Sequence, residues 1–478
     1  MPTARSARVF AVVCVAAASV LVPGAAAAAQ PSSSAPPAGS GMATPPPLEP
    51  GFPLPVDDGA PDHDYLPATP CVRSRPSSAP LVHKPWGQDL LRFTELPQFA
   101  TGAGQKVAVI DTGVAAHDYL AGRLEGGGDY VVKGGTGLDD CDGHGTEVAG
   151  IIAANPGRRD IGFRGVAPEA GIVSIRQSSG NYEYKDADNQ SHTAGDLPTL
   201  ARAIIRAAST PGVTVINMSV NNCRPASDGP IKDVEQQLQA ALRYAVEVKD
   251  IVVVSSAGNQ PEPACPAQNG PDPENPSVLV MPPWFAEYVL SVAAITQQGD
   301  PAEFSIQGPW VSVAAPGTEI TSLDPADPTA LVNQSLNEKG EARQIQGTSF
   351  AAPYVSGLVA LVRDRFDNLD AKQVMRRIMT TAAHPAATGG RDNLVGHGLI
   401  DPVAALTAFI PAEKDIPPDE VVAAPFRMPP PYERDWSPMR VAVIGSGGGV
   451  GLLLLTLFVM HTVRRNRRRS EHGVTRRA

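Results

Sequence analysis

Between residues 86 and 410, short runs of β-branched and other apolar residues alternate with longer segments of helical spacing. Such runs predict buried strands, and the segments between them predict helices. Strands that alternate with helices form a mostly parallel sheet with helices on both faces. We therefore predict a three-layer α/β fold. Strands are expected at 106–111, 171–175, 213–218, 251–256, 289–295 and 311–314, and helices at about 144–152, 200–208, 231–248 and 373–382 and directly after Ser349. A further helical pattern begins at Trp86, with Leu90, Leu91 and Phe93 expected to be buried.

Three side chains that can take part in catalysis lie at the ends of these elements. Asp111 ends the first predicted strand, His144 lies between two glycines at the start of a helix, and Ser349 lies at the start of another helix. Free N–H groups and the helix dipole favour a developing anion at that last position. Each residue alone has an ordinary explanation, as a turn acid, a loop histidine or an N-cap serine. Together, an acid, an imidazole and a hydroxyl are the groups that activate a serine nucleophile.

The motifs around these residues resemble those of the subtilisin-like serine proteases. Asp111-Thr112-Gly113, His144-Gly145-Thr146 and Gly347-Thr348-Ser349 follow one another in the order Asp, His, Ser that this family uses. The resemblance implies hydrolysis of a protein or peptide substrate by Asp111, His144 and Ser349. It implies no cofactor and no metal in the reaction.

The resemblance also assigns two further parts of the site. Asn259 follows a predicted strand and a glycine, where an asparagine is commonly a turn residue. The resemblance instead implies that its side-chain amide belongs to the oxyanion hole. Ser219-Val220-Asn221 is implied to be the extended edge on which the substrate backbone pairs. The family usually has a small glycine where this chain has Asn221, so the shape of the primary specificity pocket stays open.

Two polar segments lie near these motifs. Asp139, Asp140 and Asp142 precede His144 and have three interpretations: attraction of basic substrate residues, solvated turn residues, or a weak cation site. Residues 178–196 form a polar insertion without apolar spacing. We predict that this insertion is a surface loop near the substrate groove.

Both ends of the chain carry membrane signals. Arg5 and Arg8 precede an apolar stretch and a run of alanines, which is typical of a secretory signal peptide covering residues 1–29. Residues 441–460 contain no charge and are long enough to cross a bilayer, so we predict a transmembrane helix at 440–463. Arginines follow it at once in a basic tail, 464–478. By the positive-inside rule, this tail is cytoplasmic and the catalytic domain is extracytoplasmic, in a single-pass protein of the cell membrane.

The charge distribution argues against nucleic acid as a partner. The net charge is −10 although the last 16 residues hold seven arginines, so the middle of the chain is strongly acidic. An acidic surface repels a phosphate backbone. The membrane and a protein or peptide substrate are therefore the expected partners.

Four cysteines remain after the signal peptide: Cys71, Cys141, Cys223 and Cys265. An even number in an exported chain predicts disulfides, with three possible pairings. We favour Cys71 with Cys141, which would fix the N-terminal extension beside His144. We pair Cys223 with Cys265 because both follow predicted strands. The alternative of a metal site has no C-x-x-C motif or Cys/His cluster to support it.

Two proline-rich segments flank the predicted peptidase domain, 86–410. Residues 30–85 lack a periodic pattern and are expected to wrap the domain as an extended arm, or to act as a disordered spacer before Cys71. Subtilisins generally carry a folded inhibitory propeptide at this place. Residues 411–439 are expected to be a semi-rigid tether to the membrane.

This layout is similar to that of the mycosins, membrane-anchored subtilases of type VII secretion systems. The similarity implies processing of a secreted substrate and support of the secretion membrane complex. Two other functions remain open. One is a surface-anchored degradative protease with broad specificity. The other is a scaffold whose proteolysis is dispensable.

Overall fold

The computed structural model describes residues 42–73, 81–157, 160–262, 265–336, 342–414 and 435–473. It divides into two units, Met1–Asp415 and Ile416–Ala478. The signal peptide expected at 1–29 lies outside the described residues, as does most of the tether expected at 411–439.

The first unit is built on a seven-stranded sheet in which all strands are parallel. Its spatial order is β12-β11-β9-β7-β2-β4-β3. Most of its strands are buried along their length, as their apolar runs predict. The predicted α/β fold is therefore confirmed. The strands are β2 (Lys106–Asp111), β3 (Leu124–Asp129), β4 (Gly171–Arg176), β7 (Val213–Met218), β9 (Val252–Ser256), β11 (Val289–Ile295) and β12 (Val311–Pro316).

One of these strands, β3, has no counterpart in the sequence prediction. Its sequence, Leu-Glu-Gly-Gly-Gly-Asp, has a single apolar residue and three glycines that are poor strand formers. It lies at the edge of the sheet and forms a strand because β4 offers a row of free backbone groups beside it. A neighbour in space, rather than local propensity, decides this element.

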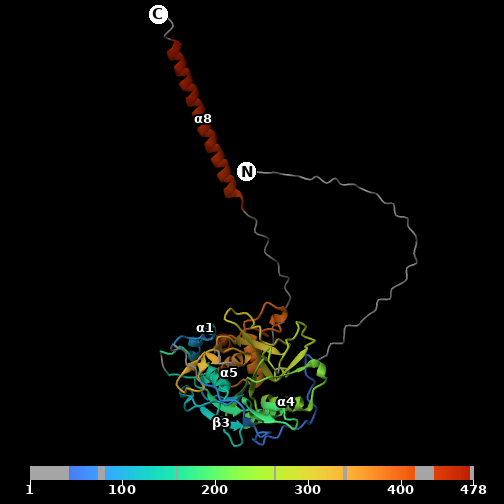
Figure 1. Cartoon of the computed structure of the whole chain (residues 1–478). Helices are drawn as coiled ribbons and strands as arrows, with labels where there is room; N and C mark the ends of the chain where they lie inside the picture. The colour runs from blue at the N-terminus through green and yellow to red at the C-terminus, as the bar shows by residue number, and fades with distance from the viewer. Residues whose placement is uncertain are drawn as a thin grey trace, which may run out of the picture. The chain divides into compact units, whose positions relative to one another are not determined.

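Two helix pairs flank the sheet. Helix α5 packs against α2 and against strands β7, β9, β11 and β12, and it is buried from Thr348 to Arg363 (Figure 1). Helices α3 and α4 pack against each other, and α3 contacts β2, β3, β4 and β7. The helices are α2 (His144–Ala153), α3 (Leu197–Ser209), α4 (Asp233–Arg243), α5 (Thr348–Arg365), α6 (Ala371–Thr381) and α7 (Pro402–Thr407).

Two helices differ in detail from the prediction. The helix expected at about 231–248 is present from Asp233, and its last turn, Tyr244–Val248, is a π-helix. The pattern that begins at Trp86 gives only the short helix α1 (Trp86–Leu90), followed by a 3₁₀ turn. Leu91 and Phe93 are buried as expected, but Leu90 is 45% exposed because the helical period ends there.

The strand order creates a crevice at one edge of the sheet. After β2, the chain adds β3 and β4 on one side and then β7, β9, β11 and β12 on the other, so the order reverses between β2 and β7. Ligand sites of open parallel sheets lie outside the carboxyl ends of the strands at such a point. Asp111 ends β2, and Ser219 directly follows β7.

Residues 42–73 form an arm against the domain. The indole N–H of Trp284 donates to the Met42 carbonyl (2.7 Å), and the Gln239 amide donates to the Pro46 carbonyl (3.0 Å). Further along, Asp57 pairs with Arg206 of α3 at 2.7 Å. Proline has no backbone N–H but keeps its carbonyl. The proline-rich arm therefore binds the domain here through its carbonyl oxygens, which accept hydrogen bonds from side chains of the domain.

The insertion at 178–196 is a β-hairpin and not the loop that its sequence suggests. Strand β5 (Ser179–Lys185) pairs antiparallel with β6 (Ser191–Ala194) and also with the arm strand β1 (Leu66–Pro67). The hairpin packs Tyr182 and Tyr184 around a small core with Tyr65 of the arm. Its third strand comes from more than 100 positions earlier in the chain, which a local pattern does not reveal.

Both expected disulfides are present. Cys71 is bonded to Cys141, and Cys223 is bonded to Cys265. The first closes a span of 70 positions and ties the end of the arm to the loop that carries His144. Six short strands form three two-stranded sheets: β8 (Asn222–Pro225) with β10 (Val278–Met281), β13 (Ser322–Leu323) with β14 (Leu331–Val332), and β15 (Gln334–Leu336) with β16 (Ala342–Gln344).

The second unit contains one long helix, α8 (Ser437–Gly473). Its segment Ser437–Arg468 is apolar and long enough to cross a membrane. The helix continues through the glycines at 445, 447, 448, 449 and 451. Glycine is more frequent in membrane helices than in soluble ones, which agrees with a bilayer as the surroundings of α8.

Candidate active site

The structure brings Asp111 and His144 into direct contact. The Nδ1 atom of His144 lies 2.7 Å from Oδ1 of the fully buried Asp111. The same carboxylate oxygen accepts the Thr112 N–H at 2.8 Å. The carboxylate therefore fixes the ring through one nitrogen and leaves Nε2 for another partner.

Glycines make this approach possible. A Cβ atom at Gly145 would lie 1.9 Å from the Gly113 carbonyl oxygen and 3.2 Å from Cβ of Asp111. Gly143, the N-cap of α2, has φ of 86°, a conformation that favours glycine. The two glycines around His144 therefore let the start of α2 pack against the end of β2.

Asp140 and Asp142 are structural residues. Asp140 accepts hydrogen bonds from the Thr112 hydroxyl, the Gly143 N–H, and both the N–H and the hydroxyl of Thr146, at 2.6–2.8 Å. Asp142 accepts from the Ser179 hydroxyl (2.5 Å) and the Gly180 N–H (2.7 Å). Their oxygens are used within the fold, which argues against the interpretation that they select basic substrate residues.

Ser349 is the second residue of α5 and is 7% exposed. Gly347, the N-cap, has φ of 153°, and a Cβ atom there would lie 2.9 Å from Oγ of Ser349 and 3.6 Å from Nδ2 of Asn259. A side chain at position 347 would therefore fill the space in front of the serine. The ring of the next residue, Phe350, lies 5.0 Å from the His144 ring.

A chain of buried hydrogen bonds holds this helix end against β7. The Ser356 hydroxyl donates to Oδ1 of Asn217 (2.7 Å), and the Asn217 amide donates to the Ser219 hydroxyl (3.0 Å). The Ser219 hydroxyl in turn donates to the Ser349 carbonyl (2.8 Å). Sequence reasoning missed Asn217 and Ser356. The signal that could have found them is a single polar residue inside an apolar strand or helix, because such a residue needs a buried hydrogen-bond partner.

Asn259 is oriented by the residue before the serine. Its Oδ1 atom accepts both the N–H and the hydroxyl of Thr348, each at 2.9 Å. These bonds turn Nδ2 toward the cavity, where it donates to Oε1 of Glu262 at 3.1 Å. An amide nitrogen has two hydrogens, so one remains for another acceptor.

The expected substrate edge lies in the same cavity. His144, Ser349, Asn259 and the segment Ser219–Asn221 all line a cavity of about 310 Å³. Asn221 lines this cavity and is bonded to the end of β9. Its amide donates to the Ser256 carbonyl (2.8 Å), and its Oδ1 accepts the Ser256 hydroxyl (2.7 Å). This double contact fixes a side chain in the cavity wall at a position where a glycine would leave space.

The charge at His144 is set by its neighbours. Burial alone lowers the pKa of an imidazole, but the charge of Asp111 and its hydrogen bond raise the pKa of His144 to about 9. In the described part of the chain, no cluster of three His, Cys, Asp or Glu residues is placed to hold a metal ion. The arrangement suits proton transfer between a hydroxyl and an imidazole, with an amide and a helix N-terminus beside it.

Comparisons with known proteins agree with this geometry. The model of the Peptidase S8 subtilase family matches residues 102–398. Mycosin-1 of Mycobacterium tuberculosis (strain ATCC 25618 / H37Rv) is 44% identical over 431 residues, which are 86% of this chain and 92% of that protein. The chain belongs to the mycosin group of subtilases. Mycosin-1 of Mycolicibacterium smegmatis is 42% identical over 84% of this chain and 89% of that protein.

Solved mycosin structures share the fold of this subtilase. MycP1 from Mycobacterium smegmatis has a TM-score of 0.71 and 40% identity, covering 81% of this chain and 99% of that one. A chain of the intact ESX-5 inner membrane complex has a TM-score of 0.71 and 38% identity, covering 88% of this chain and 99% of that one. Subtilases of the Peptidase S8 family are serine proteases, and mycosins occur in type VII secretion systems.

Proposed function

We propose that this mycosin is a membrane-anchored, extracytoplasmic serine endopeptidase that processes a secreted substrate of a type VII secretion system. The observation that carries the proposal is the His144–Asp111 contact of 2.7 Å beside a cavity that also contains Ser349 and Asn259. The presence of a similar chain in the ESX-5 inner membrane complex supports a secretion complex as the partner.

In the proposed mechanism, Asp111 holds the Nδ1–H tautomer of His144 and stabilises its imidazolium form. Nε2 of His144 takes the proton of the Ser349 hydroxyl as that oxygen attacks a peptide carbonyl, and then gives the proton to the leaving amine. Nδ2 of Asn259 and the N–H of Ser349 donate to the oxyanion. Water then hydrolyses the acyl-enzyme with His144 again as the base.

The proposed topology places the catalytic domain outside the cell. A cleaved signal peptide at 1–29 would export the chain, and α8 would retain it at the membrane with the basic tail, 464–478, in the cytoplasm. The apolar segment Ser437–Arg468 and the arginines that follow residue 463 support this orientation. The arm, 30–85, and the tether, 411–439, would lie on the same side as the domain.

Labelling with a fluorophosphonate probe tests the proposed chemistry. The full-length protein in detergent is expected to react at Ser349, because this hydroxyl lines the same cavity as His144, an imidazole whose Nδ1 contacts a carboxylate. Mass spectrometry of the tryptic peptide reports the site. Labelling elsewhere, or none with the folded protein, would contradict the proposal.

Asn221→Gly is expected to widen the specificity of the protease. Two contacts with Ser256 fix the wild-type side chain in the cavity wall, so we expect a preference for a small residue before the scissile bond. Removing it should shift the ratio of kcat/KM for peptides with phenylalanine and alanine at that position by about 10- to 100-fold toward phenylalanine. Paired fluorogenic peptides measure the ratio.

Asn222→Gly is the matched control, because Asn222 lines the same cavity and its side chain forms no hydrogen bond to a residue that the structure describes. It should leave the ratio within about threefold of the wild type. An equal shift in both variants would mean that backbone flexibility, and not the lost side chain, causes the change.

A further inference from the structure

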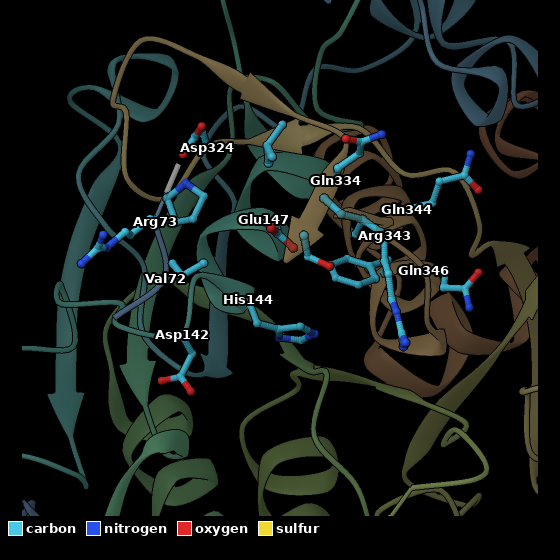
Figure 2. Close-up of a pocket in the computed structure, with 15 residues that line it drawn as sticks. Val72, Arg73, Asp142, His144, Glu147, Asp324, Gln334, Arg343, Gln344 and Gln346 are labelled. Carbon is cyan, nitrogen blue, oxygen red and sulfur yellow. The ribbon is translucent and has the colours of Figure 1, made fainter. Parts of the chain in front are cut away.

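A second cavity, of about 630 Å³, lies on the other side of His144 (Figure 2). His144 and Phe350 line it near the reaction centre, and Val72 of the arm contributes to its wall. The Cys71–Cys141 disulfide holds Val72 in place, and the Val72 N–H donates to the Cys141 carbonyl at 2.8 Å. The arm therefore completes a cavity that shares His144 with the cavity that contains Ser349.

Glu147 is the unusual residue of this cavity. It lies three positions after His144 on α2, so the two side chains emerge on the same face of the helix. Glu147 is only 9% exposed, yet its carboxyl forms no hydrogen bond to any residue that the structure describes. Figure 2 shows this carboxyl among the lining residues, between His144 and Gln334.

A buried carboxyl without a partner is unfavourable for the folded protein. Burial raises the pKa of Glu147 to about 8, against the opposing effect of the His144 charge. The fold therefore keeps a group that destabilises it when ionised. A ligand that brings a positive charge into the cavity would supply the missing partner.

The other charged residues of the cavity are already engaged or exposed. Asp142 is bonded to Ser179 and Gly180, and Asp324 accepts the N–H groups of Ala326 and Asp327. Arg73 and Arg343 are exposed, so solvent and salt screen their charges. In Figure 2, the guanidinium of Arg73 points away from Glu147. A charge on the buried Glu147 would be screened much less.

Because His144 lines both cavities, a substrate bound at Ser349 would extend into both of them. The segment Ser219–Asn221 and Asn259 lie in the first cavity, which suits the part of the substrate that becomes the acyl group. The second cavity then receives the part that leaves as an amine. We propose that it binds the side chain of a lysine or arginine in one of the two positions after the scissile bond, with the Glu147 carboxylate as its counter-ion.

A long basic side chain fits the construction of the cavity. Val332, Ile345 and Phe350 offer apolar contacts to the methylene groups of such a side chain, and Glu147 offers a charge to its end. The proposal rests on the proposed protease function and defines its substrates more narrowly. It offers another source of a preference for basic residues than Asp140 and Asp142, whose oxygens are bonded within the fold.

Matched peptides test the proposal on the full-length protein in detergent. They differ only in one residue, which is lysine or its uncharged analogue norleucine, placed first or second after the scissile bond. We expect the wild type to prefer lysine by about 10- to 100-fold in kcat/KM in at least one of the two positions. In Glu147→Gln, which keeps the size of the side chain, this ratio should fall to within about threefold of one.

Two controls separate the charge of Glu147 from general effects. Arg343→Gln removes an exposed charge on the same cavity and should raise the lysine preference by about twofold or leave it unchanged. Lysine placed before the scissile bond should show no dependence on Glu147. A wild-type ratio near one in both positions overturns the proposal without any variant, and so does a ratio that Glu147→Gln leaves intact. If the wild type cleaves no peptide at all, the proposed protease function fails and this proposal fails with it.

Discussion

Ser349→Ala is expected to lower kcat for peptide hydrolysis by about a millionfold, the loss that removal of the nucleophilic serine causes in subtilisin. Without the Ser349 hydroxyl, His144 has no nucleophile to deprotonate, and no acyl-enzyme can form. The structure predicts little change in stability, because the Ser349 hydroxyl forms no hydrogen bond to a residue that the structure describes. The loss should therefore be visible in kcat and absent from thermal unfolding.

Ser356→Ala is the matched control on the same helix. The Ser356 hydroxyl bonds to Asn217 and not to the reaction centre, so its removal should loosen the helix end and lower kcat by no more than about tenfold. If Ser349→Ala retains kcat within tenfold of the wild type, Ser349 is not the nucleophile.

The same variant decides between the proposed roles in the cell. If processing is the main role, substrates should accumulate uncleaved and secretion should fall in cells that carry Ser349→Ala. If secretion continues while cleavage stops, the chain acts mainly as a scaffold of the membrane complex. Rapid, unselective hydrolysis of casein by the wild type would instead support a degradative protease.

The sequence predicted those parts of the fold that depend on local pattern. Strand β2 and helix α5 are buried and have continuous apolar runs in the sequence, which predict where they lie. Glycines beside these runs mark the ends of both elements, and so the positions of Asp111 and Ser349. The two disulfides were chosen among three possible pairings because Cys141 lies just before His144 and because Cys223 and Cys265 both follow predicted strands.

The parts that the sequence did not predict depend on contacts between distant segments. Strand β3 forms only because β4 lies beside it, and the β5–β6 hairpin is extended by the arm strand β1. The sequence does not distinguish Asp140 from a solvent-exposed acid, yet it accepts four hydrogen bonds, three from Gly143 and Thr146 beside His144 and one from Thr112 after β2. Glu147 is hidden in the apolar helix pattern, where burial gives it a role that its position in the motif does not reveal.

Asp111→Asn is expected to lower kcat by about 10⁴-fold, as the equivalent change does in chymotrypsin-type proteases. The Thr112 N–H donates to the same oxygen that His144 Nδ1 contacts, at 2.8 Å, so an asparagine would keep its oxygen on Thr112 or turn its amide toward the ring. An amide that donates to Nδ1 places the ring proton on Nε2. His144 would then be unable to accept the proton of Ser349.

The pH dependence of the reaction distinguishes this mechanism from misfolding. His144 acts as a base only when neutral, and Asp111 holds its pKa at about 9, so kcat/KM of the wild type should rise with pH up to about that value. Without the negative charge, burial lowers the pKa of the imidazole, so the rise of kcat/KM in Asp111→Asn should occur at lower pH and reach a much lower plateau.

Asp142→Asn is the control, because its carboxylate bonds to Ser179 and Gly180. It should keep the midpoint of the wild-type pH profile and lose less than about tenfold in kcat/KM. A midpoint that stays in place in Asp111→Asn would mean that this carboxylate does not control the charge of His144.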